Sequence, residues 1–209
     1  MIKTILFQGD SITDARRDRE AAIGSGLDMG CGYVALTAGK LLKANLGREF
    51  CCINRGNGGN KVIDLYARWK IDALNFKPDL ISILVGVNDS LHEVVRKNGI
   101  ELPRYEKIYR MLLEWTKQEL PEVKLVLCEP FSLESECVSK ESYADILARG
   151  EIVKKLAAEF DATFVPLQDA INEAAALAKD NLKILRDGVH PTLAGAQVIS
   201  DQWLKHVEL

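Results

Sequence analysis

The segment Leu80-Ile81-Ser82-Ile83-Leu84-Val85 decides the fold class, because it is apolar on both faces of an extended chain. A strand of this kind is covered on both sides, which is typical of a parallel sheet between two layers of helices. Four similar runs are rich in β-branched residues, so we predict five strands in total. They are Ile2–Gln8, Phe50–Asn54, Asp79–Val85, Lys124–Cys128 and Ala162–Pro166.

The segments between these runs carry apolar residues at helical spacing and are predicted to be helices. They are Tyr33–Leu46, Val62–Phe76, Tyr105–Leu120, Tyr143–Phe160, Leu167–Ala178 and Leu193–Val207. Alternation of strands and helices predicts an α/β fold with a mostly parallel sheet and right-handed crossovers. With no internal repeat and no linker, residues 1–209 are predicted to form a single domain. Two long irregular stretches, Asp14–Cys31 and Pro130–Glu141, interrupt the alternation.

Composition excludes several classes of function. The formal net charge is −3 and the Lys and Arg residues are scattered, so no basic stripe is available for nucleic acid. No apolar run approaches the roughly 20 residues that span a bilayer, and no signal-peptide pattern precedes the first strand. We therefore expect a cytoplasmic protein with no membrane partner. The five cysteines have no zinc-ligand spacing and are interpreted as reduced thiols, so no metal is expected.

Polar residues gather in the loops that follow the first three strands and in the turn before the last helix. These loops are Gly9–Asp14, Asn54–Asn60, Gly86–Asp89 and Asp187–Pro191. In parallel α/β sheets, ligands bind beyond the carboxyl ends of the strands. The four loops are therefore predicted to share one pocket.

Within these loops, Ser11, His190 and Asp187 have the residue types that nucleophilic serine chemistry requires. Such chemistry needs a hydroxyl, a base that takes its proton and a carboxylate that orients the base. Asp187 lies three residues before His190, a spacing that lets the carboxylate reach one ring nitrogen across a turn. The oxyanion that forms would be held by the backbone N–H groups of Ser11 and Gly59 and by the Asn88 side-chain amide.

Each of these loops also has a purely structural interpretation. Ser11 could cap the segment that follows it, and the glycines around Gly59 could form an ordinary turn. Asn88 could lie in a helix cap, and the pair Asp187 and His190 could form a surface turn. No single loop outweighs its structural interpretation, but the four together, each in the expected place, favour a serine hydrolase.

The same four loops resemble the sequence blocks of the SGNH hydrolases, also called GDSL esterases/lipases. The first block is Gly9-Asp10-Ser11-Ile12-Thr13, the second-block glycine is Gly59, the third-block asparagine is Asn88, and the last block is Asp187 to His190. The resemblance spans nearly the whole chain. It implies a three-layer, flavodoxin-like α/β/α fold with a five-stranded parallel sheet. It also implies a Ser–His–Asp mechanism through an acyl-enzyme, without a metal or an organic cofactor.

A narrower resemblance points to small intracellular carbohydrate acetyl esterases. It rests on Asp14, Arg17, Gly32-Tyr33-Val34, Arg68-Trp69 and Pro130-Phe131. It implies short-chain acyl esters as substrates, with an acetylated sugar or oligosaccharide as the small-molecule partner. The chain departs from these enzymes at Ser90, where an aromatic residue would be expected.

Several alternatives stay open at this point. A lysophospholipase or thioesterase would prefer longer acyl chains, and a non-catalytic binding protein could keep the same fold. A nucleotide-binding module is disfavoured, since Lys61 stands where the G-x-G-x-x-G fingerprint needs its last glycine. A homo-oligomer is compatible with the sequence. For the charged loop with Arg16, Arg17 and Arg19, solvation or a subunit contact is favoured over binding of an acidic group.

Overall fold

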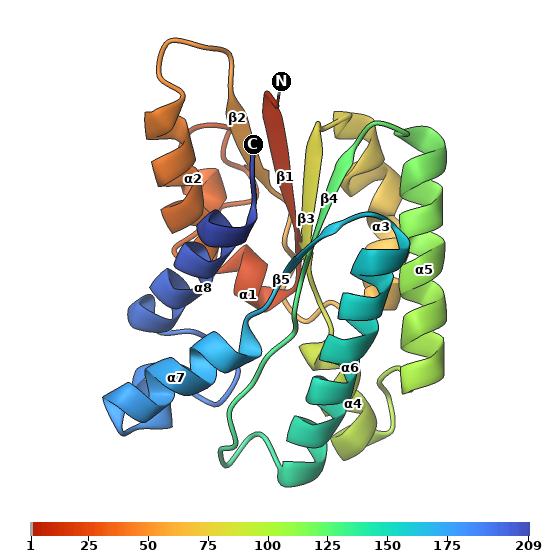
Figure 1. Cartoon of the computed structure of the whole chain (residues 1–209), viewed down its shortest axis with the longest axis vertical. Helices are drawn as coiled ribbons and strands as arrows, with labels where there is room; N and C mark the ends of the chain where they lie inside the picture. Colours follow the sequence, from red (N-terminus) through yellow and green to blue (C-terminus); the bar gives the residue numbers. More distant parts are fainter. Residues whose placement is uncertain (1) are drawn as a thin grey trace.

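The computed structural model describes residues 2–209, which form one five-stranded parallel sheet flanked by helices on both faces (Figure 1). The strand order is β2-β1-β3-β4-β5, and Leu6 in β1 pairs with Ile53 in β2 and Ile81 in β3. The strands are β1 Thr4–Gly9, β2 Cys51–Asn54, β3 Leu80–Leu84, β4 Lys124–Cys128 and β5 Thr163–Val165. The five predicted strands are therefore confirmed.

The helices divide into two layers, as Figure 1 shows. Helices α2, α7 and α8 cover one face of the sheet, and α3, α5 and α6 cover the other, with α4 packed against α6. They are α1 Ser11–Asp14, α2 Tyr33–Ala44, α3 Val62–Asp72, α4 Val87–Arg96, α5 Leu102–Glu119, α6 Lys140–Glu159, α7 Gln168–Ala178 and α8 Leu193–His206. Single 3₁₀ turns lie at Leu27–Met29, Leu74–Phe76 and Asn181–Lys183.

Strand β3 shows why the apolar pattern predicted three layers. Ile81 and Ile83 belong to the core beneath α3, α5 and α6, whereas Leu80 and Leu84 belong to the core on the opposite face. Both sets are buried, because successive side chains of a strand point to opposite faces. The central polar residue, Ser82, accepts a hydrogen bond from the indole of Trp203 in α8 at 3.0 Å. The three-layer α/β/α fold is confirmed.

Two helices depart from the sequence prediction, since α1 lies in the segment predicted as the loop after the first strand, and α4 begins in the one after the third. Helix α4 begins at Val87, inside the segment that was predicted as a loop after the third strand. Its buried residues are Val87, Asp89 and Ser90, two of them polar. Val87, Leu91 and Val94 do have helical spacing, but the polar residues that follow the third strand directly also fit a loop. Asn88 thus lies in the first turn of a helix rather than in an open loop.

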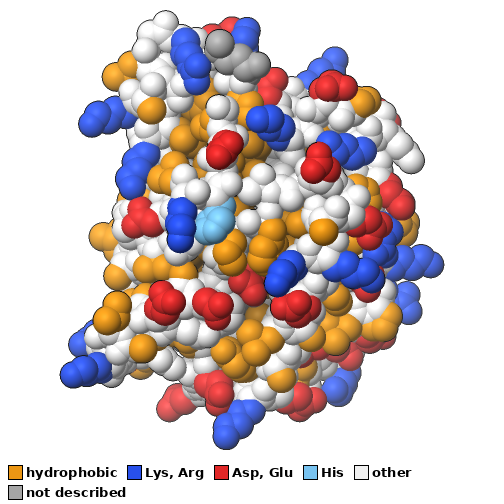
Figure 2. Space-filling view, in the orientation of Figure 1, with side chains coloured by type: hydrophobic (Ala, Val, Ile, Leu, Met, Phe, Trp, Pro, Cys, Tyr) orange, Lys and Arg blue, Asp and Glu red, His pale blue; other side chains and the backbone are white. Residues whose placement is uncertain are grey.

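The surface is mixed in charge. Figure 2 shows acidic and basic side chains interspersed over the face it presents. None of the helices within residues 2–209 combines the length and the apolar character that crossing a membrane requires. Of the cysteines, Cys52 and Cys128 are buried, Cys51 is half-buried, and Cys31 and Cys137 are exposed, all as free thiols.

Candidate active site

Ser11 is held at the first position of α1 by the residues just before it. The carboxylate of Asp10 accepts a hydrogen bond from the Ile12 N–H at 2.9 Å, so Asp10, not Ser11, caps the helix. Gly9 permits the tight exit from β1, since a Cβ there would lie 2.3 Å from the Leu84 carbonyl oxygen. Burial raises the pKa of Asp10 to about 6, against the opposing hydrogen bond from Ile12.

Ser11, His190 and Asp187 form a continuous chain of hydrogen bonds. The Ser11 Oγ lies 2.9 Å from Nε2 of His190, and Nδ1 of the same ring lies 2.7 Å from Oδ2 of Asp187. An ionised carboxylate can only accept, so Nδ1 carries the ring proton and Nε2 is free to accept from the serine hydroxyl. The structure therefore brings together the three residues that the sequence singled out.

The Asp187 carboxylate is organised by the turn that contains His190. Its Oδ1 accepts hydrogen bonds from the backbone N–H groups of Val189 at 3.0 Å and His190 at 2.8 Å. Partial burial alone would raise the pKa of Asp187, but these bonds and the one from the His190 ring hold it below its usual value. Asp187 is thus ionised at neutral pH and fixes the orientation of the imidazole.

The three predicted oxyanion donors lie on neighbouring elements. Asn88 donates from its amide to the carbonyl oxygen of Asn60 at 3.1 Å, which places its side chain against the loop that contains Gly59. Gly59 adopts a φ of +81°, in the left-handed region that favours glycine. Within residues 2–209, the N–H groups of Ser11 and Gly59 donate no hydrogen bond, so both are free to bind an oxyanion.

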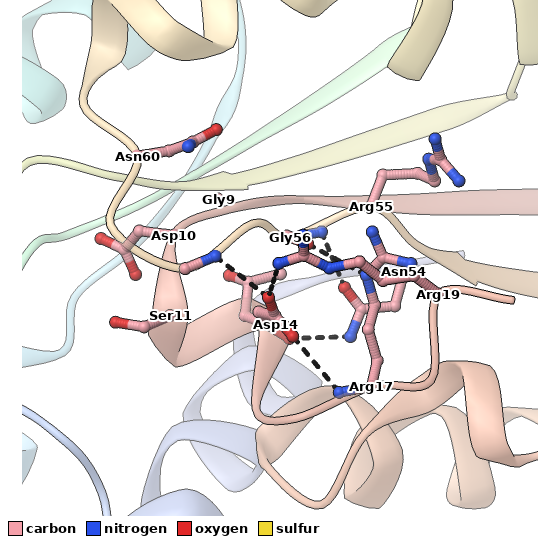
Figure 3. Close-up of polar contacts among 12 residues, drawn as sticks. Gly9, Asp10, Ser11, Asp14, Arg17, Arg19, Asn54, Arg55, Gly56 and Asn60 are labelled. Carbon is pink, nitrogen blue, oxygen red and sulfur yellow. Dashed lines mark hydrogen bonds and ion pairs between the residues drawn. The ribbon is translucent and has the colours of Figure 1, made fainter.

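Asp14 is a site residue whose role the sequence did not reveal. Its Oδ2 accepts from the Gly58 N–H at 3.0 Å and from the guanidinium of Arg19 at 2.6 Å. Figure 3 shows Asp14 on the same short helix as Ser11, facing the arginines while the Ser11 side chain points away from them. Asp14 therefore ties the helix that presents Ser11 to the loop that presents Gly59. The signal in the sequence was its position one helical turn after Ser11.

Three arginines stabilise the glycine-rich loop Asn54–Asn60 through hydrogen bonds and ion pairs. Arg17 donates to the Gly56 carbonyl oxygen at 3.0 Å, and Arg68 donates to Oδ1 of Asn60 at 2.7 Å. Arg55 and Arg68 both form ion pairs with Asp72. Arg17 and Arg68 thereby satisfy the backbone carbonyl oxygens of Gly56 and Arg55, which a buried turn would otherwise leave without partners.

A broad pocket opens beside Ser11 and His190. Its volume is about 820 Å³, and its wall is built by α1, the segment before α2, the turn that contains Asp187, and the start of α8. Among residues 2–209, no group of three or more His, Cys, Asp or Glu side chains is arranged to hold a metal ion.

Comparison with known proteins identifies the family. The sequence model of the GDSL-like Lipase/Acylhydrolase family matches residues 7–198. The chain belongs to this family. Members are acylhydrolases, and the chain is accordingly a carboxylic ester hydrolase.

The relatives agree in sequence and in fold. An acetylxylan esterase from Geobacillus stearothermophilus is 35% identical over 219 residues, which cover 97% of this chain and 93% of that protein. The crystal structure of that organism's acetylxylan esterase, Axe2, gives a TM-score of 0.85 at 33% identity, covering 97% of this chain and 93% of the other. A GDSL-like protein from Parabacteroides merdae gives 0.92 at 40% identity, with 97% and 94% covered. In Axe2, solved catalytic mutants replace a serine, an aspartate and a histidine by alanine.

Proposed function

We propose that this enzyme hydrolyses short-chain acyl esters and removes acetyl groups from a sugar or oligosaccharide. The observation that carries the proposal is the chain of hydrogen bonds from Ser11 Oγ through the His190 ring to Asp187. Its ends come from opposite ends of the sequence. Because the site needs elements from both ends, we propose that residues 1–209 act as one catalytic domain.

In the proposed mechanism, Ser11 attacks the ester carbonyl while Nε2 of His190 takes the hydroxyl proton. Asp187 keeps the ring in the tautomer that can accept this proton and stabilises the imidazolium that forms. The carbonyl carbon becomes tetrahedral, and His190 returns the proton to the departing alcohol oxygen as the carbon–oxygen bond breaks. Water activated by His190 then hydrolyses the acyl-enzyme and regenerates Ser11.

The negative charge of the tetrahedral intermediate needs donors that are already in place. The proposed donors are the N–H groups of Ser11 and Gly59, which donate no hydrogen bond within residues 2–209, and the Asn88 amide. Asn88 uses one amide hydrogen on the Asn60 carbonyl oxygen, and the second hydrogen is available for the oxyanion.

A sugar ester as substrate is supported by the acetylxylan esterase relative, whose likeness extends over nearly the full length of both chains. The pocket beside Ser11 also has room for a group of sugar size, because ligand pockets of roughly 300–1,000 Å³ bury most of a small organic molecule.

Hydrolysis of p-nitrophenyl acetate, butyrate and octanoate tests the proposal. We expect the acetate to have the highest kcat/KM, and Ser11→Ala to be folded but inactive, with the exposed serine variant Ser25→Ala as the matched control. A preference for octanoate would instead indicate a lysophospholipase or thioesterase. A wild-type protein inactive on all three esters would favour the non-catalytic binding protein.

A further inference from the structure

The pocket beside Ser11 extends to one side of the nucleophile. Among residues 2–209, its wall includes Ser11, His190 and Gly58, whereas Gly59 and Asn88 lie outside it. Its volume of about 820 Å³ greatly exceeds that of an acetyl group. If the acyl group is acetyl, as the proposed function holds, the pocket contains the alcohol part of the ester. The inference below rests on that function.

The two carboxylates in the pocket wall are already satisfied by the protein. Asp14 accepts hydrogen bonds from Gly58 N–H and the Arg19 guanidinium, and Asp187 accepts from the backbone and ring of His190. The carboxylate oxygens of both residues are therefore occupied by hydrogen bonds within the protein.

The two arginines in the same wall differ in this respect. Arg16 and Arg186 are both exposed, and within residues 2–209 neither side chain forms an ion pair or a hydrogen bond. Neighbouring arginines all have partners. Arg17 contacts Gly56 and Arg19 contacts Asp14 (Figure 3), and Arg68 forms an ion pair with Asp72. Two positive charges therefore face the pocket without a protein partner.

The backbone that carries Arg16 is held in an unusual conformation. Ala15 has a φ of 42° and Arg16 a φ of 61°, both in the left-handed region that non-glycine residues rarely adopt. The turn is clamped by the Cys31 N–H, which donates to the Ala15 carbonyl oxygen at 2.9 Å. Gly30 lies close against it, since a Cβ there would be 2.6 Å from the Asp14 carbonyl oxygen. Ala15 is the C-cap of α1, so the end of this helix and the contacts with Cys31 and Gly30 fix the backbone of Arg16.

The backbone of Arg186 is held by the turn that contains His190. Its N–H donates to the His190 carbonyl oxygen at 2.9 Å, and Leu185 forms an antiparallel bridge with Pro191. The same turn therefore positions both Arg186 and His190, so a group bound by Arg186 would keep a defined position relative to Nε2.

We propose that the pocket binds an acetylated sugar that carries a carboxylate, such as a uronic acid, with Arg16 and Arg186 as its cationic partners. A guanidinium group matches a carboxylate with two parallel hydrogen bonds. The cations would bind the alcohol part of the ester and leave the acetyl group at Ser11. Arg16 and Arg186 are specificity-determining residues in this arrangement.

Two substrates that differ in a single group test the proposal. They are the monoacetylated methyl glucuronoside and the corresponding glucuronamide, in which a neutral amide replaces the carboxylate. We expect the wild type to prefer the carboxylate by about tenfold in kcat/KM, chiefly through KM, and the preference to decline as salt screens the charges. The ratio of kcat/KM for the two substrates is compared within each protein, so any change that affects the hydrolysis of both substrates equally cancels.

Arg16→Gln and Arg186→Gln should each reduce this ratio, and the double variant should bring it close to one. Arg104→Gln, which removes an exposed arginine on α5, should leave the ratio at the wild-type value. Equal turnover of both substrates by the wild type, or an unchanged ratio in the double variant, would overturn the proposal.

Failure of the arginine proposal can be distinguished from failure of the proposed esterase function. A protein inactive on p-nitrophenyl acetate would refute the esterase mechanism. In that case, calorimetric titration with methyl glucuronoside still tests the arginine pair: binding by the wild type that is lost in the double variant supports it, and equal binding or none refutes it.

Discussion

The carboxylate of Asp89 accepts the backbone N–H of Val62 through both of its oxygens, at 3.0 and 3.2 Å. Asp89 follows Asn88 in the first turn of α4, and Val62 begins α3 just after the loop with Gly59. This fully buried contact therefore joins the starts of α3 and α4, next to the proposed oxyanion donors Gly59 and Asn88.

The same contact makes stability depend on pH. Burial raises the pKa of Asp89 from its ordinary value of 3.8 to about 7, against the hydrogen bond from Val62 and the charge of Arg149. The folded protein thus keeps a proton that the unfolded chain has released, so stability falls as pH rises between about 4 and 7. The wild type should lose up to ~1.4 kcal/mol per pH unit relative to Asp89→Asn, whose side-chain oxygen still accepts from Val62.

Urea unfolding of both proteins at pH 5 and pH 7 measures this difference. A stability difference between wild type and Asp89→Asn that is the same at both pH values would contradict the assignment.

Replacing Asn88 should impair turnover more than folding. Asn88→Ala removes one oxyanion donor, and such losses lower kcat by roughly 10²–10³. Steady-state hydrolysis of p-nitrophenyl acetate gives the effect, with thermal unfolding as a check on the fold. Asn98→Ala, an exposed asparagine beyond the end of α4, is the matched control. Turnover of Asn88→Ala close to that of the control would remove Asn88 from the mechanism.

Asp14 should act as a positioning residue for the Gly59 loop. Asp14→Ala removes the acceptor of Gly58 N–H and the partner of Arg19, so kcat should fall about tenfold with a smaller change in KM. Asp14→Asn keeps an acceptor oxygen and should restore part of the rate, a pattern that a purely structural role would not produce. Asp18→Ala serves as the control, because Asp18 is an exposed aspartate only four residues further along the chain. Equal rates for Asp14→Ala and Asp14→Asn would argue against positioning through Gly58.

The close approach of the Gly56 loop to α1 should make that glycine irreplaceable. A Cβ at Gly56 would lie 2.3 Å from the Asp14 backbone nitrogen and 2.7 Å from the Thr13 carbonyl carbon, so both backbones must shift. Gly56→Ala should destabilise the protein by about 1–3 kcal/mol. Gly39→Ala in the exposed part of α2 meets no atom within 4 Å and should stabilise by about 0.5–1 kcal/mol. Denaturant unfolding compares the two, and equal stability would show that the contact at Gly56 relaxes freely.

Most of the fold could be predicted from local patterns. Apolar runs such as Leu80–Val85 and helical spacing such as that of Tyr33–Ala44 depend on the geometry of a few consecutive residues. Helix α4 also has apolar residues at helical spacing, Val87, Leu91 and Val94, but its first turn is polar, with Asp89 and Ser90 buried, and a polar segment after a strand also fits a loop.

The contacts of the candidate site can likewise be divided into those between residues close in sequence and those that depend on the tertiary structure. Asp187 and His190 are three residues apart, so a single turn suffices to join the carboxylate and the ring, and the sequence alone could place them together. Ser11 and His190 are separated by 179 positions, and Asp14 and Gly58 by 44. Asp14 and Gly58 meet because the strand order places β2 beside β1. Ser11 and His190 meet because α8, which follows His190, packs against the sheet. The sequence by itself thus determined the elements and the reactive residue types. Only the tertiary structure decided which side chains meet, and which two arginines are left facing the pocket without partners.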